Sequence, residues 1–305
     1  MKYIAGIDGG GTKTRCLLGD TRGEVLGEGL GGPSNPVSAG MEEARCSLEE
    51  AFFQACTRAR IPPEGTCLAV VAGLAGGSTQ EVQQEVGKAL REITGAEKVQ
   101  VTTDLHIALE GGLPPGPGII VIAGTGSSAL GRDGAGHLAR AGGHGPYLGD
   151  EGGGYWIVKT AVARILRERD RTGVPSPLEL ALEKGKQKDL SWPRFFAQAP
   201  PGEIAALAPL VLERAEKGDP WAGEILERAG KELARLARDV AARLFGAAPP
   251  AGLAVAPLGS ILARFAGVRR AFQAALDAPP PFQILEPKAD PARGALLLAR
   301  KLALA

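Results

Sequence analysis

A glycine-rich segment near the N-terminus carries the residues best suited to chemistry, Asp8-Gly9-Gly10-Gly11-Thr12-Lys13-Thr14. Because glycines lack Cβ atoms, their backbone N–H groups can converge on an anion such as a phosphate. Asp8 could then hold the Mg²⁺ that neutralises the phosphates, often through water. The alternative is a tight hairpin turn that Asp8 initiates and caps.

The segment matches neither of two familiar phosphate-binding motifs. A Walker A loop counted from Gly6 requires lysine at position 12, where Thr12 stands. A dinucleotide fingerprint counted from Gly9 requires glycine at position 14, where Thr14 stands, and the residues that follow show a strand pattern rather than a helical one. Phosphate binding here would therefore use a hairpin between two strands.

The arrangement of the opening residues recurs later in the chain. Residues 3–30 predict three short strands separated by turns, and residues 119–142 predict the same order, with Gly124-Thr125-Gly126-Ser127 as the first turn. This resembles an internal duplication, although the two segments share little sequence identity. Two such turns in equivalent places of two lobes could hold a polyphosphate from both sides, with Thr12, Thr125 and Ser127 as hydroxyl donors.

Two further polar residues stand where a substrate hydroxyl could be bound or deprotonated. Asp104 follows the strand predicted at 99–103 and precedes a helix, so its carboxylate could accept a hydroxyl proton during phosphoryl transfer, or simply cap that helix. Asn35 is the only asparagine in the chain. Its amide offers a donor and an acceptor, as sugar hydroxyls require, but an asparagine before a proline also favours turns.

A long glycine loop at 142–154 contains two adjacent carboxylates. So many residues of high unfolded-state entropy are unusual in a purely structural loop. We expect Asp150 to accept hydrogen bonds from a polyhydroxylated ligand, with His144 packed or bonded beside it. For Glu151 we expect the ordinary role of capping the helix that begins near Tyr155 and pairing with its dipole.

Five motifs occur in an order that resembles a known family: D-G-G-G-T-K-T at 8–14, G-G-P-S-N-P at 31–36, T-D at 103–104, A-G-T-G-S-S at 123–128, and G-G-H-G-P-Y-L-G-D-E-G-G-G-Y-W-I at 142–157. Together they resemble the N-acetylglucosamine kinases of the BadF/BadG/BcrA/BcrD ATPase family, within the sugar kinase–Hsp70–actin superfamily. The resemblance covers residues 1–160, with a weaker adenosine-type match at Pro257-Leu258-Gly259-Ser260. It implies two ribonuclease-H-like lobes that close over ATP, Mg²⁺ and an amino sugar.

The resemblance also implies a role for each matching residue. Asp104 corresponds to the catalytic base for the sugar 6-hydroxyl, and Asp8 keeps the metal role that its position suggests. The residues expected at the nucleotide are Gly10, Gly11, Thr12, Lys13, Thr125, Gly126, Gly259 and Ser260. The residues expected at the sugar are Asn35, Asp104, Ser127, Ser128, Gly143, His144, Gly145 and Asp150.

Four positions depart from the family pattern. The family usually has asparagine where Thr103 and Ser128 stand, tryptophan where His144 stands, and serine or glycine where Ala75 stands. Three of these four lie in or near the expected sugar pocket. Phosphoryl transfer is therefore better supported than the identity of the sugar.

The elements that must position these residues are strands and helices in two copies, which indicates an α/β protein. The Leu-Pro-Pro-Gly-Pro-Gly stretch at 113–118 separates an N-terminal lobe at 1–112 from a C-terminal lobe at 113–305. A capping box that starts at Ser78 and the Asp219-Pro220 pair each predict the start of a helix. A helix at 260–276 and a closing helix at 291–304, which could pack back on the first lobe, complete the pattern.

Composition narrows the function further. The 305 residues include 35 basic and 34 acidic side chains and no basic stripe, so we expect no nucleic-acid partner. No apolar run reaches the length of a membrane span and no leader is visible, which favours a cytoplasmic protein without a membrane partner. The four cysteines show no C-x-x-C spacing and are expected to be free thiols. The family resemblance also suggests a homodimer.

Three alternatives to an N-acetylglucosamine kinase stay open at this point. A glucosamine kinase or another hexose kinase would use the same machinery. An ATPase activator of a CoA-ester dehydratase or reductase would share the phosphate motifs, but it needs cysteines for an iron–sulfur cluster, and Cys16 lies inside a predicted strand. A sugar-sensing regulator would need an added DNA-binding helix-turn-helix, whereas the first strand is predicted already at residue 3.

Overall fold

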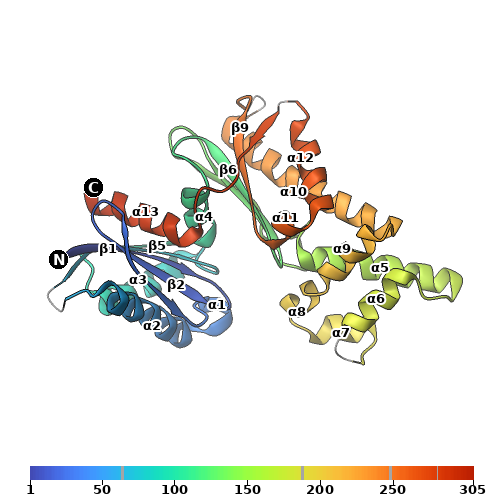
Figure 1. The fold of residues 1–305 in the computed structure, drawn as a ribbon, viewed down its shortest axis with the longest axis horizontal. Coiled ribbons are helices and arrows are strands. Elements are labelled where there is room, and N and C mark those ends of the chain that lie inside the picture. Colours follow the sequence, from blue (N-terminus) through green and yellow to red (C-terminus); the bar gives the residue numbers. More distant parts are fainter. Residues whose placement is uncertain (63–64, 187–188, 247–248, 280) are drawn as a thin grey trace. The chain divides into compact units, whose positions relative to one another are not determined.

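The computed structural model describes residues 1–62, 65–186, 189–246, 249–279 and 281–305. The chain folds into two compact units (Figure 1). Unit 1 consists of Met1–Pro115 together with Glu286–Ala305, and unit 2 consists of Gly116–Leu285.

Unit 1 is built on a five-stranded sheet in the order β3-β2-β1-β4-β5. β1, β2 and β3 form an antiparallel meander, whereas β4 and β5 run parallel to β1. The strands are β1 Lys2–Gly9, β2 Thr14–Gly19, β3 Val25–Gly31, β4 Thr66–Leu74 and β5 Lys98–Thr103. Because β1, β4 and β5 are parallel, their carboxyl ends meet at one edge of the sheet, and this edge carries Asp8 and the residue that follows β5, Asp104.

Helices cover both faces of this sheet. Leu48, Phe52 and Leu90, from the helices that follow β3 and β4, pack on one face, and Ile107 and Leu296 pack on the other. The helices of unit 1 are α1 Pro36–Ala39, α2 Met41–Ala59, α3 Gln80–Thr94, α4 Asp104–Gly112 and α13 Pro291–Leu304. α2 and α3 therefore bury apolar side chains on one face of the sheet, and α4 and α13 on the other, although α13 comes from the far end of the chain.

The closing helix α13 approaches unit 1 at backbone distance. A Cβ atom on Gly6 of β1 would lie 2.2 Å from the amide nitrogen of Leu296, and a Cβ on Gly294 would lie 1.8 Å from the carbonyl oxygen of Ile107 in α4. Two glycines thus allow α13 to bury its alanine and leucine face against β1 and α4. Because of this packing, residues 286–305 belong to unit 1, and unit 2 ends at Leu285 rather than at residue 305.

Unit 2 has a sheet of the same order as unit 1. Its strands lie in the order β10-β9-β6-β7-β8, which in reverse corresponds strand by strand to β3-β2-β1-β4-β5, with β6 as the counterpart of β1. The strands are β6 Gly118–Ala123, β7 Ser127–Arg132, β8 Leu138–Gly142, β9 Leu253–Leu258 and β10 Phe282–Ile284. The duplication predicted from two strand-turn-strand segments is thus present in the sheet topology.

The helices of unit 2 lie mainly between β8 and β9 and after β9. They are α5 Gly154–Thr172, α6 Pro177–Gly185, α7 Trp192–Gln198, α8 Pro201–Ala205, α9 Ala208–Glu216, α10 Pro220–Phe245, α11 Ser260–Arg264 and α12 Ala266–Asp277. The predicted start of α10 is confirmed, because the Asp219 side chain accepts hydrogen bonds from the amides of Trp221 and Ala222. Its apolar stripe, which includes Leu233 and Val240, is buried in the core of unit 2.

Two of the helix predictions need correction. Thr79, not Ser78, caps α3, because the Thr79 hydroxyl accepts a hydrogen bond from the amide of Val82 at 3.4 Å. The single helix expected at 260–276 is divided into α11 and α12 at Phe265, whose backbone leaves the helical region while its ring is buried in the core.

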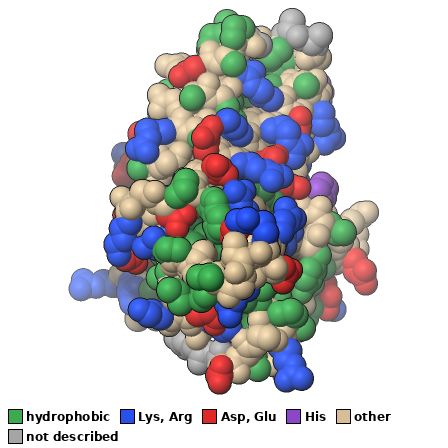
Figure 2. Space-filling view, turned by 90° about the vertical axis from the view of Figure 1, so that its right-hand side faces the viewer, with side chains coloured by type: hydrophobic (Ala, Val, Ile, Leu, Met, Phe, Trp, Pro, Cys, Tyr) green, Lys and Arg blue, Asp and Glu red, His purple; other side chains and the backbone are tan. Residues whose placement is uncertain are grey.

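Two expectations from composition can be compared with the structure. All four cysteines are free thiols, as predicted. Within the part of the chain that the structure describes, no helix combines the length and the apolar character that a membrane crossing requires. Basic and acidic side chains are interspersed over the face drawn in Figure 2.

Candidate active site

The glycine turn of unit 1 connects β1 to β2 at the carboxyl edge of the sheet. The amide of Gly10 donates to the carbonyl of Lys13 at 3.0 Å, which closes the turn. The carbonyl of Gly10 accepts hydrogen bonds from the amides of Ser34 and Asn35 at 3.0 and 3.1 Å. The loop after β3 therefore fastens the turn through its carbonyl, while Thr12 and Lys13 stay exposed.

The equivalent turn of unit 2 is fastened in the same way. The carbonyls of Gly124 and Thr125 accept hydrogen bonds from the amides of Gly154 and Tyr155, in the first turn of α5, at 2.8 and 3.0 Å. The predicted pair of turns therefore occupies equivalent positions between β1 and β2 and between β6 and β7.

Both turns present unused backbone donors. The N–H groups of Gly11, Thr12 and Thr125 make no backbone hydrogen bond to any of the described residues. A Cβ atom on Gly11 or Gly124 would have no described atom within 4 Å, and neither glycine has a positive φ. The fold itself does not require glycine at these two positions, so their missing side chains leave the donors open to an anion.

Asp8 lies beside the turn of unit 1 in an environment that disfavours its charge. Burial, followed by the negative charges of Asp104 and Asp290, raises the pKa of Asp8 to about 6, against the opposing effect of Lys13 and Arg15. A divalent cation would relieve this repulsion. Among the described residues, no group of three or more His, Cys, Asp or Glu side chains could hold a metal ion. The Asp8 carboxylate by itself fits Mg²⁺, which commonly uses one or two carboxylates together with phosphates and water.

Asp104 is the first residue of α4 and is not its cap. The hydroxyl of Thr103 accepts a hydrogen bond from the amide of His106 at 3.2 Å, which is the capping interaction. The Asp104 carboxylate accepts from the amide of Leu105 at 2.9 Å. Because Thr103 supplies the cap, capping does not account for an aspartate at position 104.

The side-chain oxygen of Asn35 has a structural role. Its carbonyl oxygen accepts hydrogen bonds from the amides of Val37 and Ser38 at 3.0 and 3.4 Å and so caps the short helix α1. The structural alternative for Asn35, a turn-forming residue before Pro36, is therefore confirmed. The Nδ2 group makes no hydrogen bond to the described residues, and a Cβ on Gly76 would lie 2.4 Å from the Asn35 oxygen. Asn35 thus lies against Gly76 with its amide donor still available.

Asp150 joins the long glycine loop of unit 2 to the turn of that unit. Its carboxylate accepts a hydrogen bond from the amide of Gly145 at 3.2 Å, and a Cβ on Gly126 would lie 2.0 Å from its second oxygen. Burial raises the pKa of Asp150, although the amides of Gly145 and Ser127 oppose this shift. Its φ of 58° is rare for a residue other than glycine, and such strained positions cluster at functional sites.

The two serines at the start of β7 both donate hydrogen bonds to backbone carbonyls of unit 2. Ser127 is buried, and its hydroxyl donates to the carbonyl of Glu151 at 2.7 Å, so it holds the loop rather than presenting a donor. The Ser128 hydroxyl donates to the carbonyl of Ala141 at 3.3 Å. His144 is exposed at the start of the loop. The capping role expected for Glu151 is wrong, because Gly153 is the N-cap of α5 and no side chain forms a capping hydrogen bond there.

A pocket of about 240 Å³ opens beside the turn of unit 2. Of the residues predicted at the nucleotide, Thr125 and Ser260 line it, while Gly259 brings α11 against the turn, since a Cβ there would lie 2.3 Å from the Ala123 carbonyl. The remaining lining residues are Gly124, Gly154, Gly202, Ala205, Ala206, Ala208, Pro209, Ile261, Arg264 and Phe265.

Sequence reasoning missed part of this lining. Residues 202–209, from α8 and the start of α9, belong to a helical segment for which the motifs predict no function. The only local signal is a run of small residues, Ala205-Ala206 and Ala208-Pro209, which is equally common in helix packing. Sequence reasoning also missed the buried hydroxyls of Thr14 and Ser34, whose oxygens lie 2.7 Å apart near the turn of unit 1.

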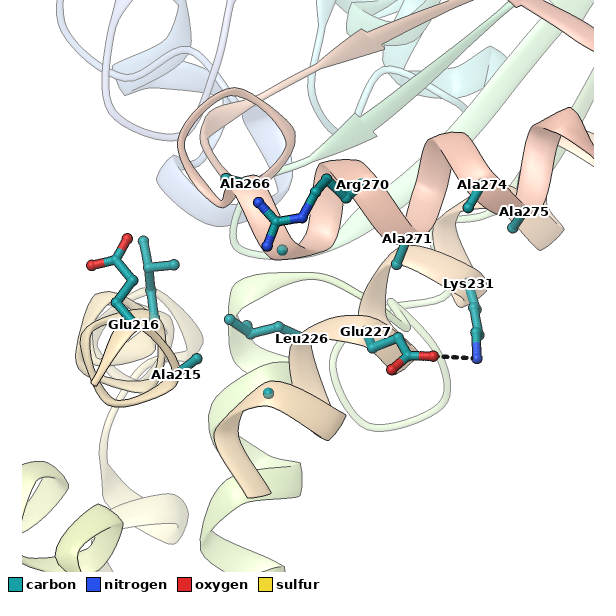
Figure 3. Close-up of a pocket in the computed structure, with 13 residues that line it drawn as sticks. Ala215, Glu216, Leu226, Glu227, Lys231, Ala266, Arg270, Ala271, Ala274 and Ala275 are labelled. Atoms are coloured by element: carbon teal, nitrogen blue, oxygen red, sulfur yellow. Dashed lines mark hydrogen bonds and ion pairs between the residues drawn. The ribbon is translucent and has the colours of Figure 1, made fainter. Parts of the chain in front are cut away.

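A larger hollow of about 750 Å³ lies between α9, α10 and α12 (Figure 3). Its lining includes five alanines and Leu226, and two of its charged residues, Glu227 and Lys231, form an ion pair at 2.6 Å. It contains none of the residues that the motifs single out. The smaller pocket, which contains Thr125 and Ser260 and opens beside the turn of unit 2, is therefore the candidate site in this unit.

Two α/β units of equal sheet order, each with an open glycine turn after its first strand, define an actin-like ATPase fold. The BadF/BadG/BcrA/BcrD ATPase family model matches residues 5–299. The chain belongs to this family. The motif resemblance and the two-lobed α/β fold class are thereby confirmed.

The chain is also similar to individual members of the family. An N-acetylmuramic acid/N-acetylglucosamine kinase of Clostridium acetobutylicum is 36% identical over 237 residues, which cover 76% of this chain and 77% of that protein. An N-acetyl-D-glucosamine kinase of Dictyostelium discoideum is 30% identical over 256 residues, with 80% of each chain covered. A crystal structure from Chromobacterium violaceum, of a protein proposed to be an N-acetylglucosamine kinase, superposes with a TM-score of 0.78 at 29% identity and covers 98% of this chain and 99% of its own.

The raised pKa of Asp8 predicts that its charge destabilises the protein without ligand. The pKa is about 6 in the folded protein and near 3.8 when unfolded, so folding becomes less favourable as pH rises through this range. Asp8→Asn should therefore increase the free energy of unfolding at pH 8 by about 1–2 kcal/mol, and by much less at pH 4. Urea unfolding at both pH values, without nucleotide or divalent cation, measures the difference.

The matched control is Asp20→Asn in the same unit. Backbone amides, first that of Glu24, lower the pKa of the exposed Asp20, so its loss should not stabilise the protein at pH 8. An Asp8→Asn protein no more stable than wild type at pH 8 would contradict the electrostatic account of this edge.

Proposed function

We propose that this protein transfers the γ-phosphoryl group of ATP to the 6-hydroxyl of an amino sugar, most simply N-acetylglucosamine. The observation that carries the proposal is the pair of fastened glycine turns whose N–H donors are unused. Membership of the ATPase family and similarity to kinases named for N-acetylated amino sugars support it.

In this proposal the backbone binds the phosphates. The turns at 10–13 and 124–126 supply N–H donors, and the exposed hydroxyls of Thr12 and Thr125 supplement them. The 240 Å³ pocket beside Thr125 and Ser260 would receive the adenosine. Its lining of small side chains suits a flat base, which gains from close apolar contact.

Asp8 is the residue that would hold Mg²⁺, directly or through water. Bound there, the ion neutralises charge on the phosphates. The buried carboxylate, with the charge of Asp104 nearby, gives the cation a favourable position. The other ligands would be phosphate oxygens and water.

Asp104 is the proposed general base. Its carboxylate would accept the proton of the sugar hydroxyl as the new oxygen–phosphorus bond forms and ADP leaves with the electrons of the broken bond. The remaining sugar contacts would come from the Asn35 amide donor in unit 1 and from the loop of Asp150 and His144 in unit 2. Ser127 would act only by holding that loop.

The choice among sugars depends on the residues that depart from the family pattern. Ser128 is shorter than the usual asparagine, and the exposed His144 replaces a tryptophan, so the pocket gains room. A glucosamine kinase or another hexose kinase therefore stays the alternative. We also propose that the protein is a cytoplasmic homodimer; its four free thiols agree with a reducing compartment.

Sugar-stimulated release of ADP tests the proposed function directly. ATP would be incubated with N-acetylglucosamine, N-acetylmuramic acid, glucosamine, glucose or N-acetylmannosamine, with and without Mg²⁺. We expect an N-acetylated amino sugar to give the highest kcat/KM and Mg²⁺ to be required. If no sugar raises ADP release above the rate without sugar, the kinase proposal fails, and phosphate mapping of the product decides the hydroxyl.

The role of Asp104 predicts the effect of its amide variant. Asp104→Asn should lower kcat by at least about 100-fold while the ATP affinity changes little, because an amide cannot accept the proton. Glu42→Gln, which neutralises an exposed carboxylate in α2, is the matched control and should keep wild-type kcat. A wild-type rate for Asp104→Asn would leave Asp104 as a helix-terminal residue only.

The open turns predict a selective loss of nucleotide binding. Gly11→Ala and Gly124→Ala should fold normally, because a Cβ at either position meets no described atom, but each should raise the Kd of ATP about tenfold by obstructing the phosphates. Gly134→Ala, in the turn between β7 and β8, is the matched control. Isothermal titration and thermal unfolding give the two readouts, and unchanged ATP affinity in both variants would refute the phosphate role of the turns.

A further inference from the structure

An arginine is fixed against two of the residues expected at the sugar. Arg140, near the end of β8, donates from Nε to the Ser128 hydroxyl at 3.3 Å and from Nη2 to the Gly143 carbonyl at 3.0 Å. A Cβ on Gly143 would lie 2.1 Å from Nη2. The guanidinium group thus lies directly over the backbone of Gly143, inside unit 2.

The charge of Arg140 has no counter-ion within the part of the chain that the structure describes. The other interaction at this residue is made by Arg243, which donates from Nη1 to the Arg140 carbonyl at 2.6 Å and brings a second positive charge. Both arginines are exposed, and neither forms an ion pair with a described carboxylate. By contrast, Arg15 and Arg235 each pair with two carboxylates. The edge of β8 beside Ser128 is therefore locally cationic.

The geometry leaves Arg140 able to bind an anion. The guanidinium carries five N–H donors, of which the two hydrogen bonds use one on Nε and one on Nη2. The donors on Nη1 and the second on Nη2 remain, and a guanidinium presents such donors to both oxygens of a carboxylate. Since the existing bonds already fix the plane of the group, little side-chain entropy is lost when an anion binds.

We propose that Arg140 selects amino sugars that carry an anionic substituent. The proposal rests on the proposed function, because that function places the sugar beside Ser128 and Gly143. A neutral sugar needs no cation at this position, a carboxylate gains a charge-assisted pair, and a protonated amine is repelled. We therefore expect kcat/KM to be highest for an acidic sugar, lower for a neutral sugar and lowest for a cationic sugar.

Three sugars that differ mainly in charge test the proposal. N-acetylmuramic acid is N-acetylglucosamine with a lactyl ether whose carboxylate is ionised at neutral pH, while glucosamine carries an amine that is largely protonated. Arg140→Gln should lower kcat/KM for N-acetylmuramic acid about 10- to 100-fold more than it lowers kcat/KM for N-acetylglucosamine. Arg140→Glu should lower the first further and raise kcat/KM for glucosamine.

The design separates charge recognition from a structural role and from failure of the kinase proposal. If Arg140 only supports the loop, all three sugars lose activity together and the melting temperature falls, which overturns the proposal. Activity of wild type on N-acetylglucosamine without activity on N-acetylmuramic acid also overturns it and leaves the kinase function intact. Inactivity on every sugar refutes the kinase function itself. Arg171→Gln, an exposed arginine at the end of α5, is the control and should change no sugar's kcat/KM.

Discussion

The structure depends on how the two glycine turns are fastened. In unit 1 the Gly10 carbonyl accepts hydrogen bonds from amides of the loop after β3, and in unit 2 the Gly124 and Thr125 carbonyls accept from amides at the start of α5. A backbone held by its carbonyls directs its remaining N–H groups outward, where no part of the described chain covers them. The same bonds therefore supply rigidity and an anion-binding surface.

Two residues near these turns, Asp8 and Asp150, lower the stability of the folded protein. Asp8 keeps a carboxylate where burial and neighbouring charges raise its pKa to about 6. Asp150 adopts a backbone conformation that favours glycine. The surrounding sheet and helices hold these two residues in conformations that would otherwise be unfavourable. Residues of this kind are commonly found at functional sites, where folding stability is lower than it could be.

The duplicated sheets have diverged through what is inserted between equivalent strands. Between β3 and β4, unit 1 has α1 and α2, which pack on the sheet and, through Asn35, border the turn. Between β8 and β9, unit 2 has the longer segment α5 to α10, of which α8 and α9 line the 240 Å³ pocket. The same sheet topology thus carries different groups in the two units: Asp8 and Asp104 at the strand ends of unit 1, and a pocket beside the turn of unit 2.

The sequence by itself determined the features that depend on neighbouring residues. Glycine turns between short apolar runs predicted the paired strands, the Asp219-Pro220 pair predicted the start of α10, and residues 291–304 were predicted as the closing helix. The family and its motifs could also be identified, because the turn residues and carboxylates stand in a fixed order along the chain. These signals are local, so they survive without knowledge of the packing.

Tertiary structure alone decided which groups are free to act and which are occupied. Ser127 was expected to present its hydroxyl, but a carbonyl twenty-four residues away takes it. The assignment of α13 to unit 1 follows from backbone contacts at Gly6 and Gly294, and the place of Arg140 follows from the pairing of β7 with β8. Contacts of this kind join residues far apart in sequence, and whether they form depends on how closely two backbones approach, which no local pattern records.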